Sequence, residues 1–173
     1  VETRVHTKER GELGFQRYFV KHRWQPTVTS INYLGIDDAK VNTSIQEVIT
    51  NADAVIIGPS NPWLSIKPIL NIPGIADLMN SQEIPRVAVT PLIQGKAVKG
   101  PTAKIMRELG YEVSVKTVVA NYQHIINGFV VDERDTLTLS SDIRTLAIDT
   151  LMDNNEKRIT VAKKILNWLG NWI

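Results

Sequence analysis

Residues 53–74 read DAVIIGPSNPWLSIKPILNIPG, and the organisation of the chain follows from this stretch. Its first part, Ala54 to Ile57, is an unbroken apolar run rich in β-branched side chains, which predicts a strand buried on both faces of a parallel sheet. Gly58 and Pro59 predict the end of that strand, because glycine tolerates positive φ and proline has no N–H for the ladder. The short polar side chains that follow are typical of a helix start: Ser60, Asn61 and Ser65.

This strand-to-helix turn is a candidate ligand site. In open α/β sheets, small molecules bind just beyond the carboxyl ends of the strands, and the free N–H groups at a helix start attract anions. The alternative is a well-capped turn that binds nothing. From residues 58–61 alone, the two interpretations have equal weight.

The composition is that of an ordinary globular domain. The chain has 173 residues, 43% hydrophobic and 22% charged, so a single α/β domain over residues 1–173 is expected. Twenty basic and 18 acidic residues give a net charge of +2, which favours neither a nucleic-acid nor a membrane surface. There is no cysteine, which excludes disulfides and thiol chemistry. No apolar run approaches the length of about 18 residues that a membrane span needs, so we expect a cytoplasmic protein.

Strands and helices alternate along the rest of the chain. The second predicted strand, the helix that starts at Thr43 and the strand at Ala54 are expected to form a β-α-β unit. The alternation as a whole predicts a Rossmann-like, doubly wound α/β fold, with a mostly parallel sheet and helices on both faces. The other strands are predicted at 3–7, 27–34, 86–90, 111–115, 129–132 and 143–148, and the other helices at 13–22, 63–70, 75–80, 101–109, 116–127 and 156–172.

Polar residues follow the predicted strands. Because the carboxyl ends of parallel strands meet at one edge of a sheet, these loops are expected to lie together and to form a site. The loops are residues 58–61, Thr90 with residues 94–100, residues 132–135, and residues 149–150.

The loop GKAVKGPTAK, residues 95–104, has the most phosphate-like sequence of the four. Lys96 and Lys99 supply cations, Gly95 and Gly100 permit close backbone approach, and the helix that opens at Pro101 supplies amides. The loop does not match the G-x-x-x-x-G-K-[ST] pattern of nucleoside triphosphatases. A lysine-bearing turn in solvent therefore stays open as the alternative.

Other polar residues point to structural roles. Acidic residues after a strand usually cap the next helix or face water, as expected for Asp132, Glu133 and Asp135, and Asp149 with Thr150 is typical of an N-cap. Trp63 could stack on an aromatic ligand but is more typical of the core. No spacing indicates a triad or a metal cluster for His6, His22 and His124, so no catalytic residue and no metal ligand is assigned.

The order of several motifs resembles the 2-phospho-L-lactate transferases, the CofD family, which make the deazaflavin coenzyme F-420. The run from Ile57 to Pro62, followed by Ser65, carries the resemblance most clearly, and nearly all 173 residues agree. The other blocks are Pro68-Ile69-Leu70, Pro73-Gly74-Ile75, Phe15-Gln16, Tyr18-Phe19-Val20, Arg23-Trp24, residues 96–101, Lys104-Ile105-Met106, residues 128–132 and residues 149–152.

The resemblance implies a transferase that moves a phospholactyl or phosphoenolpyruvyl group from a guanosine-diphosphate-linked donor to a deazariboflavin hydroxyl. GMP leaves and magnesium assists. The donor's guanosine diphosphate would then be held by two loops whose residues are Gly58, Pro59, Ser60, Asn61, Pro62 and Ser65, and Lys96, Lys99 and Gly100. Lys96 and Lys99 are expected to neutralise charge.

Members of that family are about twice as long and open with a Gly-Gly-Thr-Gly turn, which is absent here. The chain is therefore expected to be the C-terminal portion of a transferase, inactive by itself. Two alternatives stay open: a non-catalytic nucleotide-sugar-binding regulator of the gluconeogenesis-factor type, and a scaffold without chemistry.

Association is also predicted from the sequence. A doubly wound sheet without its first strands exposes a strand edge and an apolar face, which proteins rarely leave uncovered. The C-terminal helix carries Trp168, Trp172 and Ile173, which would extend that apolar surface. A homo-oligomer is expected, with the alternative that both indoles cover the sheet of their own chain.

Overall fold

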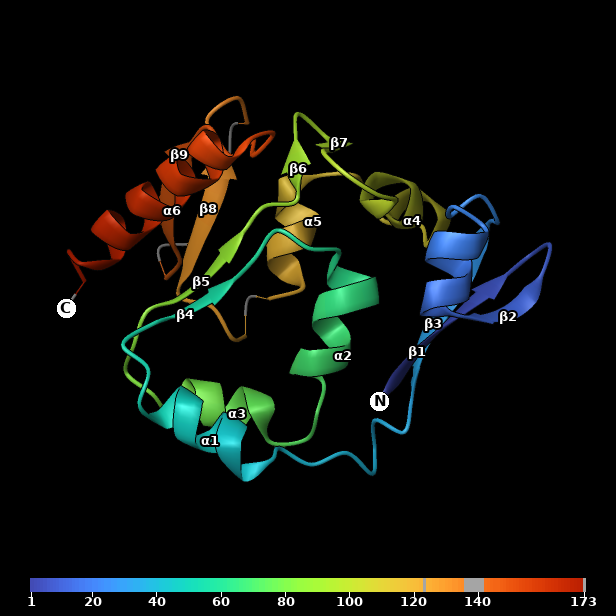
Figure 1. Ribbon diagram of the computed structural model, residues 1–173, viewed down its shortest axis with the longest axis horizontal. Helices are drawn as coiled ribbons and strands as arrows, with labels where there is room; N and C mark the ends of the chain where they lie inside the picture. Colours follow the sequence, from blue (N-terminus) through green and yellow to red (C-terminus); the bar gives the residue numbers. More distant parts are fainter. Residues whose placement is uncertain (123, 136–141, 173) are drawn as a thin grey trace.

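A four-stranded parallel sheet forms the centre of the computed structural model, which describes residues 1–122, 124–135 and 142–172 (Figure 1). The strand order is β4-β5-β8-β9, and every neighbouring pair is parallel, with Ile56 beside Val87 and Ala88 beside Phe129. This sheet confirms the predicted α/β fold. Its strands are β4 (Val55–Ile57), β5 (Arg86–Val89), β8 (Gly128–Asp132) and β9 (Arg144–Ile148).

Helices cover both faces of the sheet, as predicted. Strand side chains alternate between faces, so Val87 and Val89 pack on one side against α6 (Asn155–Leu169), while Ala88 points into the core on the other side. That second core includes Leu64, Met106 and Val118, and its helices are η2 (Pro62–Ile66), α2 (Lys67–Leu70), α4 (Thr102–Glu108) and α5 (Val115–Ala120). No helix in the described part of the chain is long and apolar enough to cross a membrane.

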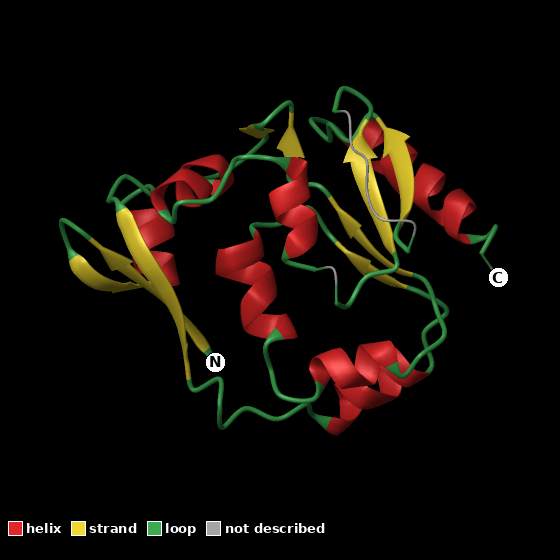
Figure 2. Cartoon of the chain, turned by 180° about the vertical axis from the view of Figure 1, so that it is seen from behind, coloured by secondary structure: helices red, strands yellow, loops and turns green. Residues whose placement is uncertain are grey.

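The N-terminal strands form a separate antiparallel sheet, seen at the far end of the molecule from α6 (Figures 1 and 2). The order is β2-β1-β3, from β1 (Glu2–Thr7), β2 (Gly11–Gly14) and β3 (Val28–Leu34). The predicted β-α-β unit is therefore wrong, because β3 pairs with β1 and not with β4. The helix within that unit is present as α1 (Thr43–Thr50), capped by Asn42.

Two further predictions need correction, and one hairpin was missed. The helix predicted at 13–22 is shorter than expected, because β2 extends to Gly14; the helical segment runs from Phe15 to Lys21 and ends in the π-helical turn η1 (Arg17–Lys21). The strand predicted at 111–115 is absent: residues 111–114 form a loop and Val115 begins α5, since Ser114 caps that helix by accepting a hydrogen bond from the N–H of Thr117 at 3.2 Å. The hairpin β6 (Leu92–Ile93) and β7 (Lys96–Ala97) was not predicted. The helix expected at 75–80 is present as α3 (Ile75–Asn80).

Strand β4 has its predicted position but not its predicted burial. It forms one edge of the parallel sheet, and the side chain of Ile56 is 44% exposed. An apolar run in the sequence therefore does not distinguish a central strand from an edge strand.

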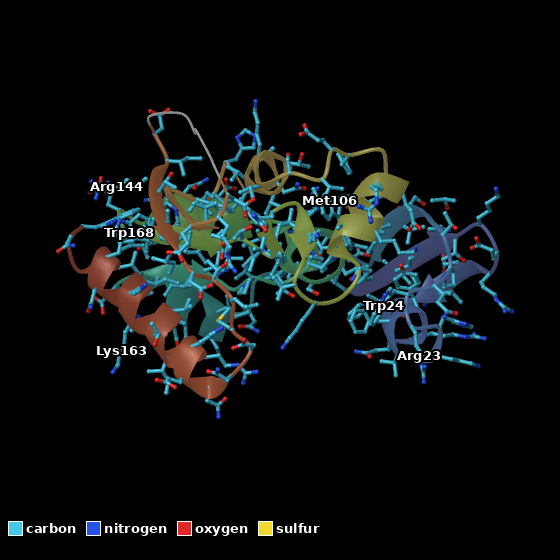
Figure 3. All side chains as sticks on the ribbon, turned by 90° about the horizontal axis from the view of Figure 1, so that it is seen from above. Arg23, Trp24, Met106, Arg144, Lys163 and Trp168 are labelled. Carbon is cyan, nitrogen blue, oxygen red and sulfur yellow. The ribbon has the colours of Figure 1, made fainter. Side chains whose placement is uncertain are left out.

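Trp168 of α6 and Trp172, which follows the helix, cover their own sheet. The rings of Trp168 and Trp172 meet edge to face at 4.8 Å, and the Arg144 guanidinium of β9 lies 4.5 Å from the Trp172 ring (Figure 3 labels Arg144 and Trp168). A Cβ at Gly128 would lie 2.6 Å from Trp172, so β8 requires glycine where the indole approaches. Ile173 lies outside the described residues.

Candidate functional site

The four polar loops do lie at one edge of the parallel sheet, because each follows a strand that runs in the same direction (Figure 1). Two neighbouring cavities open there and share Pro59 and Lys99. Cavity A, of about 330 Å³, is lined by Phe15, Phe19, Pro59, Ser60, Asn61, Leu64, Ser65, Lys99, Gly100, Pro101 and Thr102. Cavity B, of about 220 Å³, is lined by Pro59, Thr90, Pro91, Val98, Lys99, Thr150, Met152 and Arg158.

The structure separates the nine predicted site residues into three groups. Six of them line cavity A: Pro59, Ser60, Asn61, Ser65, Lys99 and Gly100. Pro62 is buried beneath the loop as the first residue of η2, and Gly58 precedes the cavity at the end of β4. Lys96 lies on the hairpin strand β7 and lines neither cavity.

Asn61 builds the site from within. Its Oδ1 accepts hydrogen bonds from the N–H groups of Trp63 at 3.0 Å and Leu64 at 2.9 Å, which caps η2. Its Nδ2 donates to Oγ1 of buried Thr102 at 3.1 Å. Since Thr102 opens α4, one carboxamide joins the loop after β4 to the lysine loop and sets the width of cavity A.

Three polar groups at cavity A are unengaged. Among the described residues, the hydroxyls of Ser60 and Ser65 and the ammonium of Lys99 form no side-chain hydrogen bond or ion pair. Two hydroxyl donors and a cation at one concave surface suit a phosphate or carboxylate. The rest of the lining is largely apolar, which is typical of a small-molecule pocket.

Glycine contributes in the lysine loop and not in the loop after β4. Gly58 does not have positive φ, contrary to the expectation, and a Cβ there would meet no atom within 4 Å. Gln94 and Gly95 both have positive φ, as the tight turn between β6 and β7 requires, and Gly100 has φ of 71°. Asp135 holds that turn, since its carboxylate accepts the Gln94 N–H at 2.9 Å.

The acidic loop after β8 has a structural role, because the carboxylate of Asp132 is held by donors of the protein itself. Asp132 is fully buried and accepts hydrogen bonds from the Arg134 guanidinium and from the N–H and hydroxyl of Thr150, at 2.9 and 2.8 Å. Burial alone would raise the pKa of Asp132, but the hydrogen bonds from Arg134 and Thr150 outweigh it and hold the pKa well below its usual range. Arg134 also pairs with Asp149 at 2.6 Å.

These carboxylates do not form a metal site. No group of three His, Cys, Asp or Glu side chains among the described residues has a geometry that could hold a metal ion. At this edge of the sheet, the carboxylate of Asp132 is bound by Thr150, that of Asp149 by Arg134, and that of Asp135 by the backbone N–H of Gln94. Two of the expected roles are wrong: Asp132 is buried and does not face water or cap a helix, and α6 is capped by Asn154 and not by Asp149 or Thr150.

Trp63 is part of the core, as expected. It is 4% exposed, stacks on Tyr111 with ring centroids 5.4 Å apart, and lines neither cavity. Its backbone carbonyl accepts a hydrogen bond from the Tyr33 hydroxyl at 2.6 Å, which fixes η2 against β3.

Sequence analysis missed four lining residues that come from distant parts of the chain. Phe15 and Phe19 reach cavity A from the helical segment after β2, and Met152 and Arg158 reach cavity B from the loop before α6 and from its first turns. The position of Arg158 in the first turn of a helix that follows a strand was the available signal. Nothing in the local sequence around Phe19 indicates that its ring packs beside Gly100 of the lysine loop.

A parallel sheet with cationic and hydroxyl-bearing loops at its carboxyl edge defines a class, the α/β proteins that bind small anionic ligands at that edge. The model of the family described as 2-phospho-L-lactate transferase CofD matches residues 1–166. The chain belongs to the CofD family.

Named relatives agree with this assignment. A 2-phospho-L-lactate transferase from Methanosarcina barkeri is 36% identical over 89% of this chain, and one from Methanococcoides burtonii is 34% identical over 99%. A phosphoenolpyruvate transferase from Thermobifida fusca is 34% identical over 94%. The alignments cover 50%, 56% and 51% of those proteins, so the chain spans about half the length of the relatives it matches.

A solved structure shares the fold. A UPF0052 family protein from Bacillus halodurans superposes with a TM-score of 0.57 at 14% sequence identity, over 95% of this chain and 58% of that one. At this identity, the comparison bears on the architecture alone.

Proposed function

We propose that this chain is part of a transferase that moves a phospholactyl or phosphoenolpyruvyl group from a guanosine-diphosphate-linked donor to a deazariboflavin hydroxyl, with release of GMP. The family match and the names of the relatives support this proposal. The observation that carries it is cavity A, where Ser60, Ser65 and Lys99 present unengaged polar groups at the carboxyl edge of the sheet.

The reaction would replace one oxygen on phosphorus by another. The acceptor's hydroxyl oxygen forms a bond to the phosphorus that carries the transferred group, the bond from that phosphorus to the oxygen of GMP breaks, and the hydroxyl proton leaves. Positioning and charge neutralisation dominate such reactions. Lys99, which lines both cavities, would offset phosphate charge.

Magnesium is implied by the family resemblance, but no group of three His, Cys, Asp or Glu side chains among the described residues could hold it, and the oxygens of Asp132, Asp135 and Asp149 at this edge accept hydrogen bonds from protein donors. No step is assigned to the metal on these residues. A magnesium requirement, like a cytoplasmic location, stays a prediction.

The regulator alternative has weaker support. The relatives that are 34–36% identical are named transferases, whereas the UPF0052 likeness is at 14% identity and bears on fold alone. A scaffold role would leave cavity A without a ligand.

Isothermal titration of guanosine diphosphate tests the proposal. Lys99→Ala is expected to weaken binding by about tenfold or more, since a charge-assisted hydrogen bond contributes about 1.5–3 kcal/mol. Lys96→Ala is the matched control, because Lys96 lies in the same hairpin region but lines neither cavity. Equal losses in both variants, or in neither, would reject the assignment of Lys99.

We also propose self-association through the exposed edge of β4. Ile56, Ile45 and Ile69 are 44%, 40% and 54% exposed and line one apolar groove of about 400 Å³ beside that edge. Trp168 and Trp172 do not contribute to this association surface, since both indoles pack on their own sheet.

A further inference from the structure

Three aromatic side chains form a ladder that leads out of cavity A. The ring centroids of Phe15 and Phe19 are 5.5 Å apart, and those of Phe19 and Trp24 are 5.0 Å apart. Phe15 and Phe19 are half-buried in the cavity wall, while Trp24 is 37% exposed. Each pair is tilted, by 52° and 46°, within the range that aromatic contacts favour.

The backbone that presents Trp24 is held in an unfavourable conformation. Arg23 and Trp24 are consecutive residues with φ of 47° and 49°, a region that costs about 1–3 kcal/mol for each residue other than glycine. Fully buried Tyr18 fixes the turn, because its carbonyl accepts the Trp24 N–H at 3.1 Å and its hydroxyl donates to the Trp24 carbonyl at 3.4 Å. Strain of this kind is maintained by surrounding contacts and is concentrated at ligand sites.

The ladder meets the lysine loop directly. A Cβ built on Gly100 would lie 3.6 Å from the Phe19 ring, so the loop backbone packs against that ring. Cavity A is therefore lined both by the aromatic rings of Phe15 and Phe19 and by Ser60, Ser65 and Lys99. A ligand that joins an anionic group to a planar ring would contact both.

We propose that the ladder binds the planar aromatic ring of a substrate whose anionic part lies at Ser60, Ser65 and Lys99. Phe15 and Phe19 contact the ring, and Trp24 positions Phe19 from outside the cavity. The inference rests on the proposed function, in which two rings are available: the guanine of the donor and the deazaflavin of the acceptor. Stacking of a planar ring on an aromatic side chain is the shared chemistry.

Binding of guanosine diphosphate and of deazariboflavin to variants of the 173-residue chain tests this inference. Phe19→Leu is expected to lower the affinity for one of the two ligands by about tenfold, which is the contribution of one stacked aromatic ring. Phe19→Tyr keeps the ring and is expected to keep the affinity, and thermal melting checks that each variant is folded. Trp24→Leu is compared with the same substitution at Trp172, which lies at the opposite end of the molecule, beside the labelled Trp168 (Figure 3).

Comparing the two ligands shows whether the ladder binds the guanine of the donor or the deazaflavin of the acceptor. Loss of deazariboflavin binding alone assigns the ladder to the acceptor, and loss of guanosine diphosphate binding alone assigns it to the donor base. If folded Phe19→Leu and Trp24→Leu bind both ligands as Trp172→Leu does, or if the unsubstituted chain binds neither, the inference is wrong. If guanosine diphosphate binds but Lys99→Ala has no effect, the proposed function fails, independently of the ladder.

Discussion

At the residue scale, the site depends on a division of labour between side chains that shape the cavity and side chains that are available to a ligand. Asn61 uses both ends of its carboxamide within the protein, whereas Ser60 beside it is exposed and unengaged. The sequence motif contains both residues and does not distinguish these roles, because the partner Thr102 lies 41 positions further on.

Substitution of Asn61 is expected to act on stability. Asn61→Ala removes the cap of η2 and the bond to Thr102, and should lower the free energy of unfolding by about 1–2 kcal/mol. Ser60→Ala should change it by less than about 0.5 kcal/mol, because an exposed side chain without partners is removed. Urea denaturation measures both, and equal stabilities of the two variants would contradict the structural role of Asn61.

Asp132 predicts an acid-sensitive fold. Because its pKa is lowered in the folded protein, the carboxylate contributes stability above its unfolded pKa of about 3.9, and the contribution is lost as the pH falls through the folded value. Asp132→Asn should destabilise the protein at pH 7, by roughly 3 kcal/mol, and should flatten the decline in stability below about pH 4. Denaturation curves from pH 7 to pH 2 test this. A variant with the same acid decline as the unsubstituted chain would show that another group is responsible.

At the element scale, sequence patterns predicted the positions of strands and helices better than they predicted which strands pair. The runs at β5, β8 and β9 and the long amphipathic α6 lie where periodicity placed them, and the loops after the strands do converge. Strand β3 was also correct in position, yet its partner is β1, because strand pairing is a long-range contact that hydrophobic alternation does not encode.

The same limit explains what was missed at the site. Lys96 and Lys99 lie in the same loop sequence and look equally suited to bind a phosphate. Only the structure distinguishes them, because the hairpin places Lys96 on β7, away from the cavity that Lys99 lines. Phe15 and Phe19 come from an element predicted as one helix, and a local pattern gave no reason to place them beside Gly100. The loops of the sheet edge were therefore predictable, but the aromatic lining of cavity A was not.

At the scale of the whole molecule, the exposed edge of β4 predicts association. Light scattering of the chain at micromolar concentration should show a dimer or a higher oligomer, because unpaired strand edges with apolar neighbours tend to pair. Ile56→Asp should shift the protein toward the monomer. Ile159→Asp is the control, since Ile159 is 55% exposed on α6 and lines neither cavity nor the groove beside β4. A monomeric unsubstituted chain would refute the prediction.

The chain by itself is expected to lack transferase activity. No group of His, Cys, Asp or Glu side chains among the described residues could hold a metal ion, and the relatives are about twice as long. Incubation of the 173-residue chain with magnesium, a guanosine-diphosphate-linked phospholactate donor and deazariboflavin should give no product. Turnover under these conditions would show that the chain carries a complete active site.

The central claim is that the loops at the carboxyl edge of the parallel sheet hold the guanosine diphosphate part of the donor. Amide chemical shifts of the chain, recorded by NMR during titration with guanosine diphosphate, test it residue by residue. The account predicts that the largest changes fall in residues 59–65 and 98–102, with Lys96 little affected. Changes centred on α1 or on the apolar groove beside β4, with residues 59–65 and 98–102 unaffected, would contradict it.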